Sequence, residues 1–109
     1  MRNGLYRSWF KGPFAQGCSA IILLDGRAIA SDPGHSYIGD FTDVGGHFHA
    51  EVKAKRHTRL KLPAAMADLD AFTIICDGPS AQETATLTCV VPEAPGNEVE
   101  IKLMWVSEI

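Results

Sequence analysis

Apolar and polar side chains alternate along much of this chain, and this alternation restricts the possible folds more than any other feature. The clearest stretch covers residues 47–57. Its apolar positions are Phe48, Ala50, Val52 and Ala54, and its polar positions are His47, His49, Glu51, Lys53, Lys55 and His57. Successive side chains of a β-strand point to opposite faces, so we expect one face of this strand to contact a core and the other to contact water.

Further strands are predicted between turn signals such as Asp25-Gly26 and Asp32-Pro33-Gly34. They cover residues 5–11, 17–24, 27–31, 35–41, 71–76, 83–91 and 99–105. Residues 43–46 and 77–79 are expected to be turns. The stretch 17–24 is almost entirely apolar, which predicts a strand that is buried on both faces. Residues 63–69, which begin with a proline, are expected to form one short helix or a loop.

Eight short strands in 109 residues predict a single domain over residues 1–109. Almost every connection is a local hairpin, and closing the sheet removes its exposed edges. We therefore expect an all-β fold, an eight-stranded antiparallel up-and-down barrel. The side chains predicted to fill its core or lumen are Phe48, Val52, Leu87, Ile101, Leu103 and Trp105. Small inward residues, namely Ala50, Ala54 and Ala85, are expected to leave room at one end.

The formal net charge of −3 gives no basic face for nucleic acid or for an anionic membrane surface. No apolar run approaches the roughly 18–20 residues of a membrane span, and the N-terminus leads directly into a patterned strand. These features predict a cytoplasmic protein. Cys18, Cys76 and Cys89 each lie in an apolar run, and their odd number argues against a disulfide framework. We expect all three to be buried free thiols.

No motif for nucleophilic or acid–base catalysis is present, so we expect no enzymatic activity and no cofactor. His47, His49 and Glu51 share one strand face and resemble half of the metal motif of the cupin family. Lys53 and Lys55 lie on the same face and would repel a cation, so a solvated face without metal is the favoured interpretation.

Several segments together resemble the GrlR-like family, which are negative regulators of type III secretion gene expression. These segments are Asn3-Gly4-Leu5-Tyr6 with Phe10, Gly17 with the apolar run that ends at Asp25-Gly26, Asp32 with Tyr37-Ile38-Gly39, and Thr86-Leu87-Thr88. The resemblance implies a lipocalin-like (calycin) barrel that forms a homodimer. It also implies a regulator that acts by binding a partner protein, a helix-turn-helix transcriptional activator, and not DNA.

The chain departs from the family in the loop through which the family is proposed to contact its partner. The family has four consecutive acidic residues after its Tyr-x-Gly strand, whereas this chain offers only Asp40, Thr42 and Asp43 there. Ala30-Ser31 also replaces a pair of glycines. The sequence is therefore compatible with two functions. One is a dimeric regulator that contacts a partner protein through Asp40, Thr42 and Asp43, and the other is a barrel that binds an apolar small molecule.

Overall fold

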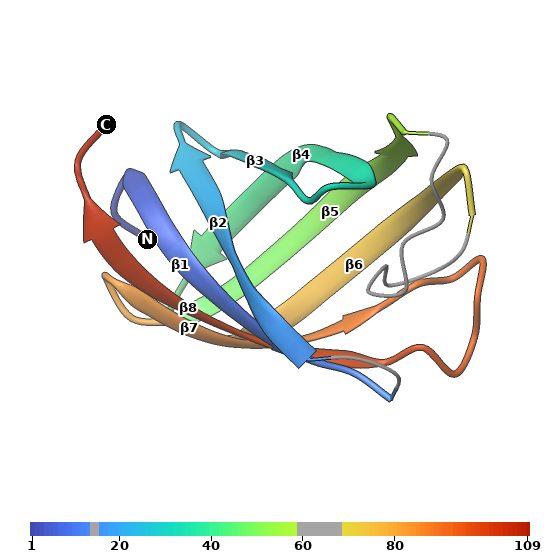
Figure 1. Ribbon diagram of the computed structural model, residues 1–109. Coiled ribbons are helices and arrows are strands. Elements are labelled where there is room, and N and C mark those ends of the chain that lie inside the picture. The colour runs from blue at the N-terminus through green and yellow to red at the C-terminus, as the bar shows by residue number, and fades with distance from the viewer. Residues whose placement is uncertain (14–15, 59–68) are drawn as a thin grey trace.

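A computed structural model describes residues 1–13, 16–58 and 69–109, and it shows a closed antiparallel barrel of eight strands. Each strand pairs with its neighbours in the chain, and the last strand pairs with the first (Figure 1). The strands are β1 (Gly4–Lys11), β2 (Gln16–Leu24), β3 (Arg27–Ser31), β4 (His35–Val44), β5 (His47–Arg56), β6 (Ala71–Pro79), β7 (Thr84–Val90) and β8 (Val99–Ser107). The predicted all-β up-and-down barrel is confirmed.

The described residues contain no helix, and so none that could cross a membrane. Except for Leu69, the helix or loop predicted for residues 63–69 lies outside the described part of the chain.

Two-residue turns connect β2 to β3 and β4 to β5. Asp25 and Gly26 have φ values of 49° and 79°, and Gly45 and Gly46 have values of 60° and 77°. Positive φ at both central residues gives the turn whose twist matches that of the flanking strands. The second turn is tighter than the expected 43–46, because Asp43 and Val44 continue β4 and pair with β5.

The predicted end of β6 at Cys76 is wrong, because the strand continues to Pro79. Gly78 is part of its ladder with β5 and is not in a turn. A Cβ atom at this position would lie 2.0 Å from the backbone oxygen of Thr86 in β7. Glycine is needed here because β6 and β7 approach too closely for a side chain.

The inward and outward faces of β5, β7 and β8 follow the predicted alternation. Phe48, Leu87 and Leu103 are buried. The other three predicted lumen residues, Val52, Ile101 and Trp105, are partly buried and pack against the same core. Trp105 lies near the chain ends, where its indole N–H donates to the backbone oxygen of Asn3 (3.2 Å). The Arg2 guanidinium lies 3.9 Å from the centre of the Trp105 ring, a cation–π contact.

The expectation that residues 17–24 are buried on both faces is wrong. In β2, Leu23 is buried, whereas Cys18, Ala20 and Leu24 are exposed. A closed barrel has its core on one side of the sheet only, so the apolar outer face of β2 lies at the surface.

The expectation of three buried free thiols is also wrong. Cys76 and Cys89 form a disulfide between β6 and β7, and Cys18 is an exposed free cysteine. The two bonded cysteines are buried, as expected, but they lie directly opposite each other in the ladder with their Cα atoms 4.1 Å apart. Strand register, which the odd number of cysteines does not reveal, brings them together.

Candidate functional site

One half of the barrel is filled with large side chains. Tyr6, Leu23 and Phe48 are buried in this half, and Phe41 packs against them. The rings of Phe41 and Phe48 stack with their centroids 5.2 Å apart. Among the described residues, these side chains pack closely against one another in this half.

The other half contains a cavity of about 610 Å³ with mostly apolar walls. Small inward residues create it, namely Ser8, Gly17, Ser19, Ala28 and Ala30. Ser8 and Ser19 lie opposite each other in the register of β1 and β2. The volume falls within the roughly 300–1,000 Å³ of sites that hold small molecules.

The predicted position of the empty space inside the barrel is wrong. Val52 and Ile101 line the cavity, as two of the predicted lumen residues. Ala50, Ala54 and Ala85 are buried, but none of them is among the described residues that line the cavity. Each of these alanines is packed into the core cluster.

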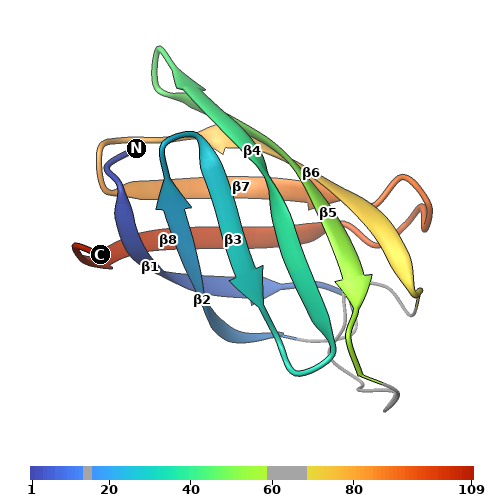
Figure 2. The same cartoon turned by 90° about the horizontal axis from the view of Figure 1, so that it is seen from above.

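The wall beside the cavity is incomplete between β2 and β3. These strands pair only over Ile21–Leu24 and Arg27–Ala30, and the described residues from Gln16 to Ala20 have no partner in β3. Figures 1 and 2 show the two strands diverging from their shared turn. Cys18, Ala20 and Ile29 occupy outward positions and yet line the cavity. The cavity therefore reaches the surface through this gap.

Asp32 organises the polar end of the cavity. One of its carboxylate oxygens accepts hydrogen bonds from the backbone N–H groups of Gly34 (2.8 Å) and His35 (2.7 Å). Its other oxygen accepts a hydrogen bond from the Tyr37 hydroxyl. Burial, followed by the hydrogen bond and the negative charge of Asp32, raises the pKa of Tyr37 well above its usual range. Tyr37 therefore acts as a hydrogen-bond donor committed to Asp32.

His35 is 1% exposed and lines the same cavity. Its Nε2 lies 2.9 Å from the backbone oxygen of Leu69, and its ring meets the Phe72 ring edge-on. A carbonyl oxygen can only accept, so Nε2 carries a proton, and in the neutral imidazole Nδ1 is then an acceptor. Nδ1 is buried and has no hydrogen-bond partner among the described residues. Leaving such an atom unpaired costs about 1–3 kcal/mol.

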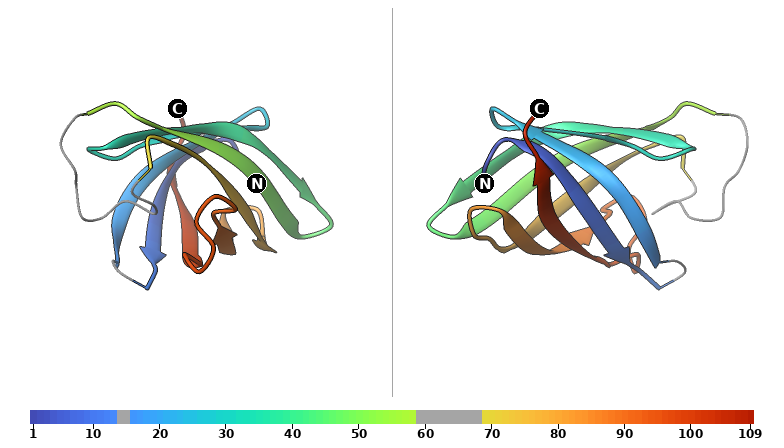
Figure 3. Two further views of the ribbon diagram at one scale, coloured as in Figure 1. Left: turned by 90° about the vertical axis from the view of Figure 1, so that its right-hand side faces the viewer. Right: turned by 60° about the vertical axis from the view of Figure 1, so that its left-hand side comes forward.

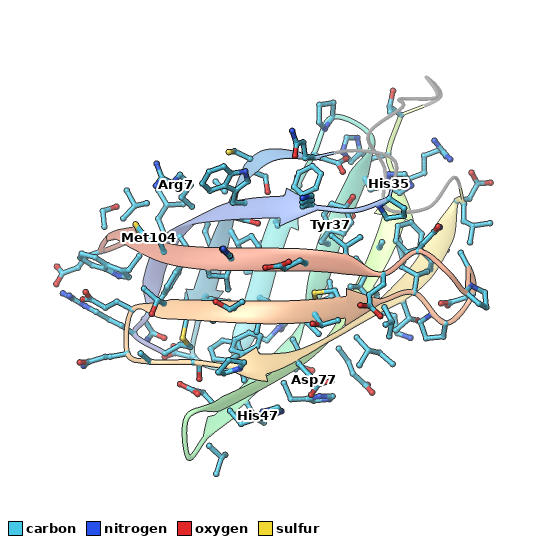
Figure 4. All side chains as sticks on the ribbon, turned by 90° about the horizontal axis from the view of Figure 1, so that it is seen from below. Arg7, His35, Tyr37, His47, Asp77 and Met104 are labelled. Carbon is cyan, nitrogen blue, oxygen red and sulfur yellow. A yellow bond between two sulfur atoms is a disulfide. The ribbon has the colours of Figure 1, made fainter. Side chains whose placement is uncertain are left out.

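Charged and polar groups at the rim of the cavity form hydrogen bonds and an ion pair with one another. The Nε of Arg56, a residue that lines the cavity, donates to Asp70 (2.8 Å). The Nε2 of His57 donates to the backbone oxygen of Asp32 (2.9 Å). Asp70 thus meets the charge of Arg56, and the carboxylate of Asp32 has donors on both of its oxygens. Figure 4 labels His35 and Tyr37, which lie at the same end of the barrel, and Figure 3 views the barrel from two further sides.

Asp32, His35 and Tyr37 were not predicted as site residues from the sequence. The sequence placed Asp32 in a turn and among the residues that resemble the GrlR-like family, and it placed His35 at the start of a strand. One signal was available, because His35 and Tyr37 are two residues apart on a predicted strand and so share its inward face. The sequence alone does not indicate that this face lines a cavity.

The residues predicted to contact a partner lie on β4, at the other end of that strand. Thr42 is exposed, and Asp40 forms an exposed ion pair with Arg27 (3.4 Å). Asp43 is engaged by the N-terminal amine of Met1 and by the Ser80 hydroxyl. The hydrogen bond from the N-terminus, with a smaller contribution from Ser80, lowers the pKa of Asp43. Little unpaired negative charge remains at these three positions.

The histidine-rich face of β5 contacts a carboxylate of the neighbouring strand. His49 Nδ1 lies 2.7 Å from one carboxylate oxygen of Asp77 in β6. His47 Nε2 lies 3.2 Å from the same oxygen, and Figure 4 labels His47 and Asp77. These contacts, His49 foremost, lower the pKa of Asp77. Within residues 1–13, 16–58 and 69–109, no three His, Cys, Asp or Glu side chains are grouped so that they could hold a metal ion.

No protein-family model matches the sequence, and no curated protein matches it either.

Proposed function

We propose that this protein binds a small, mostly apolar molecule inside its barrel. The observation that carries the proposal is the cavity of about 610 Å³ that opens between β2 and β3. Its apolar walls would stabilise a guest by removing apolar surface from water, at about 25 cal/mol per Å². The role is that of a carrier or sensor in the cytoplasm, with no chemical change to the guest.

A neutral fluorescent probe, N-phenylnaphthylamine, tests the proposal in a titration of the purified protein. We expect saturable binding with an increase in fluorescence. Ala30→Phe places a ring into the cavity from its β3 wall and should weaken binding by about tenfold, which corresponds to about 1.4 kcal/mol. The matched control is Thr86→Phe, because Thr86 is exposed on β7 and outside the described lining of the cavity.

Equal affinities for the wild type and Ala30→Phe would contradict the proposal, since the probe would then bind elsewhere. Circular dichroism of all three proteins verifies that each is folded. A loss of binding in Thr86→Phe would indicate a general effect of added bulk.

A second candidate function is contact with another protein, as the resemblance to GrlR-like regulators implies. One observation favours it, a row of isoleucines on the outside of the barrel. Ile22, Ile29 and Ile38 lie side by side in the register of β2, β3 and β4, and Ile29 and Ile38 are 38% and 45% exposed. Adjacent apolar side chains at a surface are typical of a protein interface. A second copy of the chain is the partner that we propose, and a helix-turn-helix activator remains a prediction from the resemblance.

Ile29→Lys tests this second candidate by placing a charge in the centre of the row. We expect light scattering to give the mass of a dimer for the wild type and of a monomer for Ile29→Lys. Thr86→Lys is the matched control and should remain dimeric. A monomeric wild type at high protein concentration would contradict a dimer.

A further inference from the structure

We propose that the cavity takes an uncharged, mostly apolar guest whose polar group is a carbonyl oxygen, and that the hydroxyls of Ser8 and Ser19 bind this oxygen. The inference rests on the proposed function and names the chemistry of the guest. It follows from the position of the two hydroxyls in the cavity wall and from their lack of hydrogen-bond partners among the described residues.

Ser8 and Ser19 form one polar spot on the inner wall of the barrel. Both residues line the cavity, and they lie directly opposite each other in the register of β1 and β2. On each strand the residues on either side of the serine are exposed, so alternation directs both hydroxyls inward. The Cβ atoms of directly opposite residues are about 4.5–5.5 Å apart, so one guest atom can reach both hydroxyls.

The two hydroxyls are unpaired and accessible from the cavity. Ser8 is 2% exposed and Ser19 is half-buried, and neither hydroxyl forms a hydrogen bond with another described residue. Among the residues that the structure describes and that are not exposed, His35 Nδ1 is the one side-chain atom that is both unpaired and without accessible surface. The unpaired oxygens of Ser8 and Ser19 therefore retain accessible surface. Because these side chains point inward, that surface borders the cavity.

A carbonyl oxygen suits this pair of hydroxyls. Each serine hydroxyl has one proton to donate, and a carbonyl oxygen has two lone pairs, so a single carbonyl can accept from both serines. Without such a guest, two hydroxyls stand unpaired in a mostly apolar wall, which is unfavourable for a buried polar group. The guest carbonyl removes this disadvantage while its apolar part contacts the remaining wall.

Charge favours a neutral carbonyl over a carboxylate. Arg56 is the only lysine or arginine among the described residues that line the cavity, and it forms an ion pair with Asp70. A carboxylate would lose its hydration inside apolar walls and would meet two neutral donors at the serines in place of a positive charge. A ketone loses far less hydration and uses the same two donors.

Two ligands of nearly the same shape test the inference, namely 2-nonanone and 2-methyl-1-nonene, in which a CH₂ group replaces the carbonyl oxygen. Their affinities are measured by displacement of N-phenylnaphthylamine from the wild type, Ser8→Ala and Ser19→Ala, after the affinity of the probe for each protein has been determined. We expect each substitution to weaken binding of the ketone roughly three- to tenfold, the effect of one hydrogen bond, and to change binding of the alkene less than about twofold. Comparing one ligand between proteins cancels the different hydration of the two ligands.

Ser36→Ala is the matched control, because Ser36 lies on β4 outside the described lining of the cavity. It should leave both affinities unchanged. The infrared carbonyl stretch of bound 2-nonanone gives a second readout that needs no variant. Hydrogen bonding weakens the C=O bond, so we expect a lower frequency in the wild type than for the ketone dissolved in hexane, and a return toward the hexane value in Ser8→Ala/Ser19→Ala.

The outcomes separate this inference from the proposed function. An equal response of the ketone and the alkene to the serine substitutions, or a carbonyl stretch in the wild type equal to that in hexane, would overturn the inference and leave a ligand-binding barrel. Failure of both ligands, and of the probe itself, to bind would overturn the proposed function and the inference with it.

Discussion

Single polar residues decide the chemistry of a cavity whose walls are otherwise apolar. Asp32 closes the turn between β3 and β4 with two backbone hydrogen bonds, and it also holds the Tyr37 hydroxyl. The turn was predictable, because aspartate before proline and glycine favours this local hydrogen bonding. The hydrogen bond from the Tyr37 hydroxyl was not predictable, because only the folded β4 strand brings Tyr37 to the Asp32 carboxylate.

The two tyrosines of the chain are expected to resist ionisation while the protein is folded. Burial is the largest cause of the raised pKa of both Tyr6 and Tyr37. A raised pKa means that the neutral form is favoured in the folded state. The resulting stabilisation is complete below the unfolded value of about 10 and is lost as pH rises above it.

The ultraviolet absorbance of tyrosinate measures this effect directly. We expect less tyrosinate near pH 10 in the native protein than in urea, where both tyrosines should be about half ionised near that pH. Tyr37→Phe then assigns any remaining signal. Equal amounts of tyrosinate near pH 10 in the native protein and in urea, with the fold intact, would show that the tyrosines are solvated in the native protein.

Among the strand pairs, β6 and β7 share a notably short ladder. Only Ile75–Val90, Cys76–Cys89 and Asp77–Thr88 pair between them, and the disulfide occupies the middle pair. The existence of both strands was predictable from alternation and turn residues. The extension of β6 through Gly78 was not, because glycine and proline are ordinarily signs of a turn, and the close approach of Thr86 that requires glycine is a property of the assembled sheet.

Reduction of the disulfide should destabilise the barrel. The cysteines are 13 residues apart, and a cross-link over a loop of that size contributes about 2–3 kcal/mol to the free energy of unfolding. Urea unfolding with and without a reducing agent measures the difference. Cys18→Ser, which removes only the free thiol, should show the same difference between the oxidised and reduced forms.

Counting reactive thiols provides the complementary measurement. One thiol per chain should react in urea without reductant, and three should react after reduction. Three reactive thiols before reduction, or equal stability of the oxidised and reduced forms, would contradict the cross-link. In a compartment that keeps thiols reduced, the stability of the reduced form is the relevant one.

For the molecule as a whole, the important property is the uneven filling of the barrel. Tyr6, Leu23, Phe41 and Phe48 occupy one half, and serines, alanines and a glycine border the cavity in the other. The eight strands and most of their inward residues were predictable from a period of two. The position of the cavity was not predictable, because it depends on which side chains lie at the same height along the barrel axis. The register of neighbouring strands sets this height. For example, it places the large Phe41 opposite the small Ala50.

The short pairing of β2 with β3 has a consequence for timing. A guest that had to wait for the whole barrel to open would be exchanged at the slow rate of global unfolding. Here the cavity already reaches the surface between the two strand ends, so exchange requires at most a local movement there, and such movements occur at a much lower free energy than unfolding. Residence time and stability can therefore vary independently, so that substitutions along Gln16–Ala20 would alter how long a guest remains without altering how firmly the protein is folded.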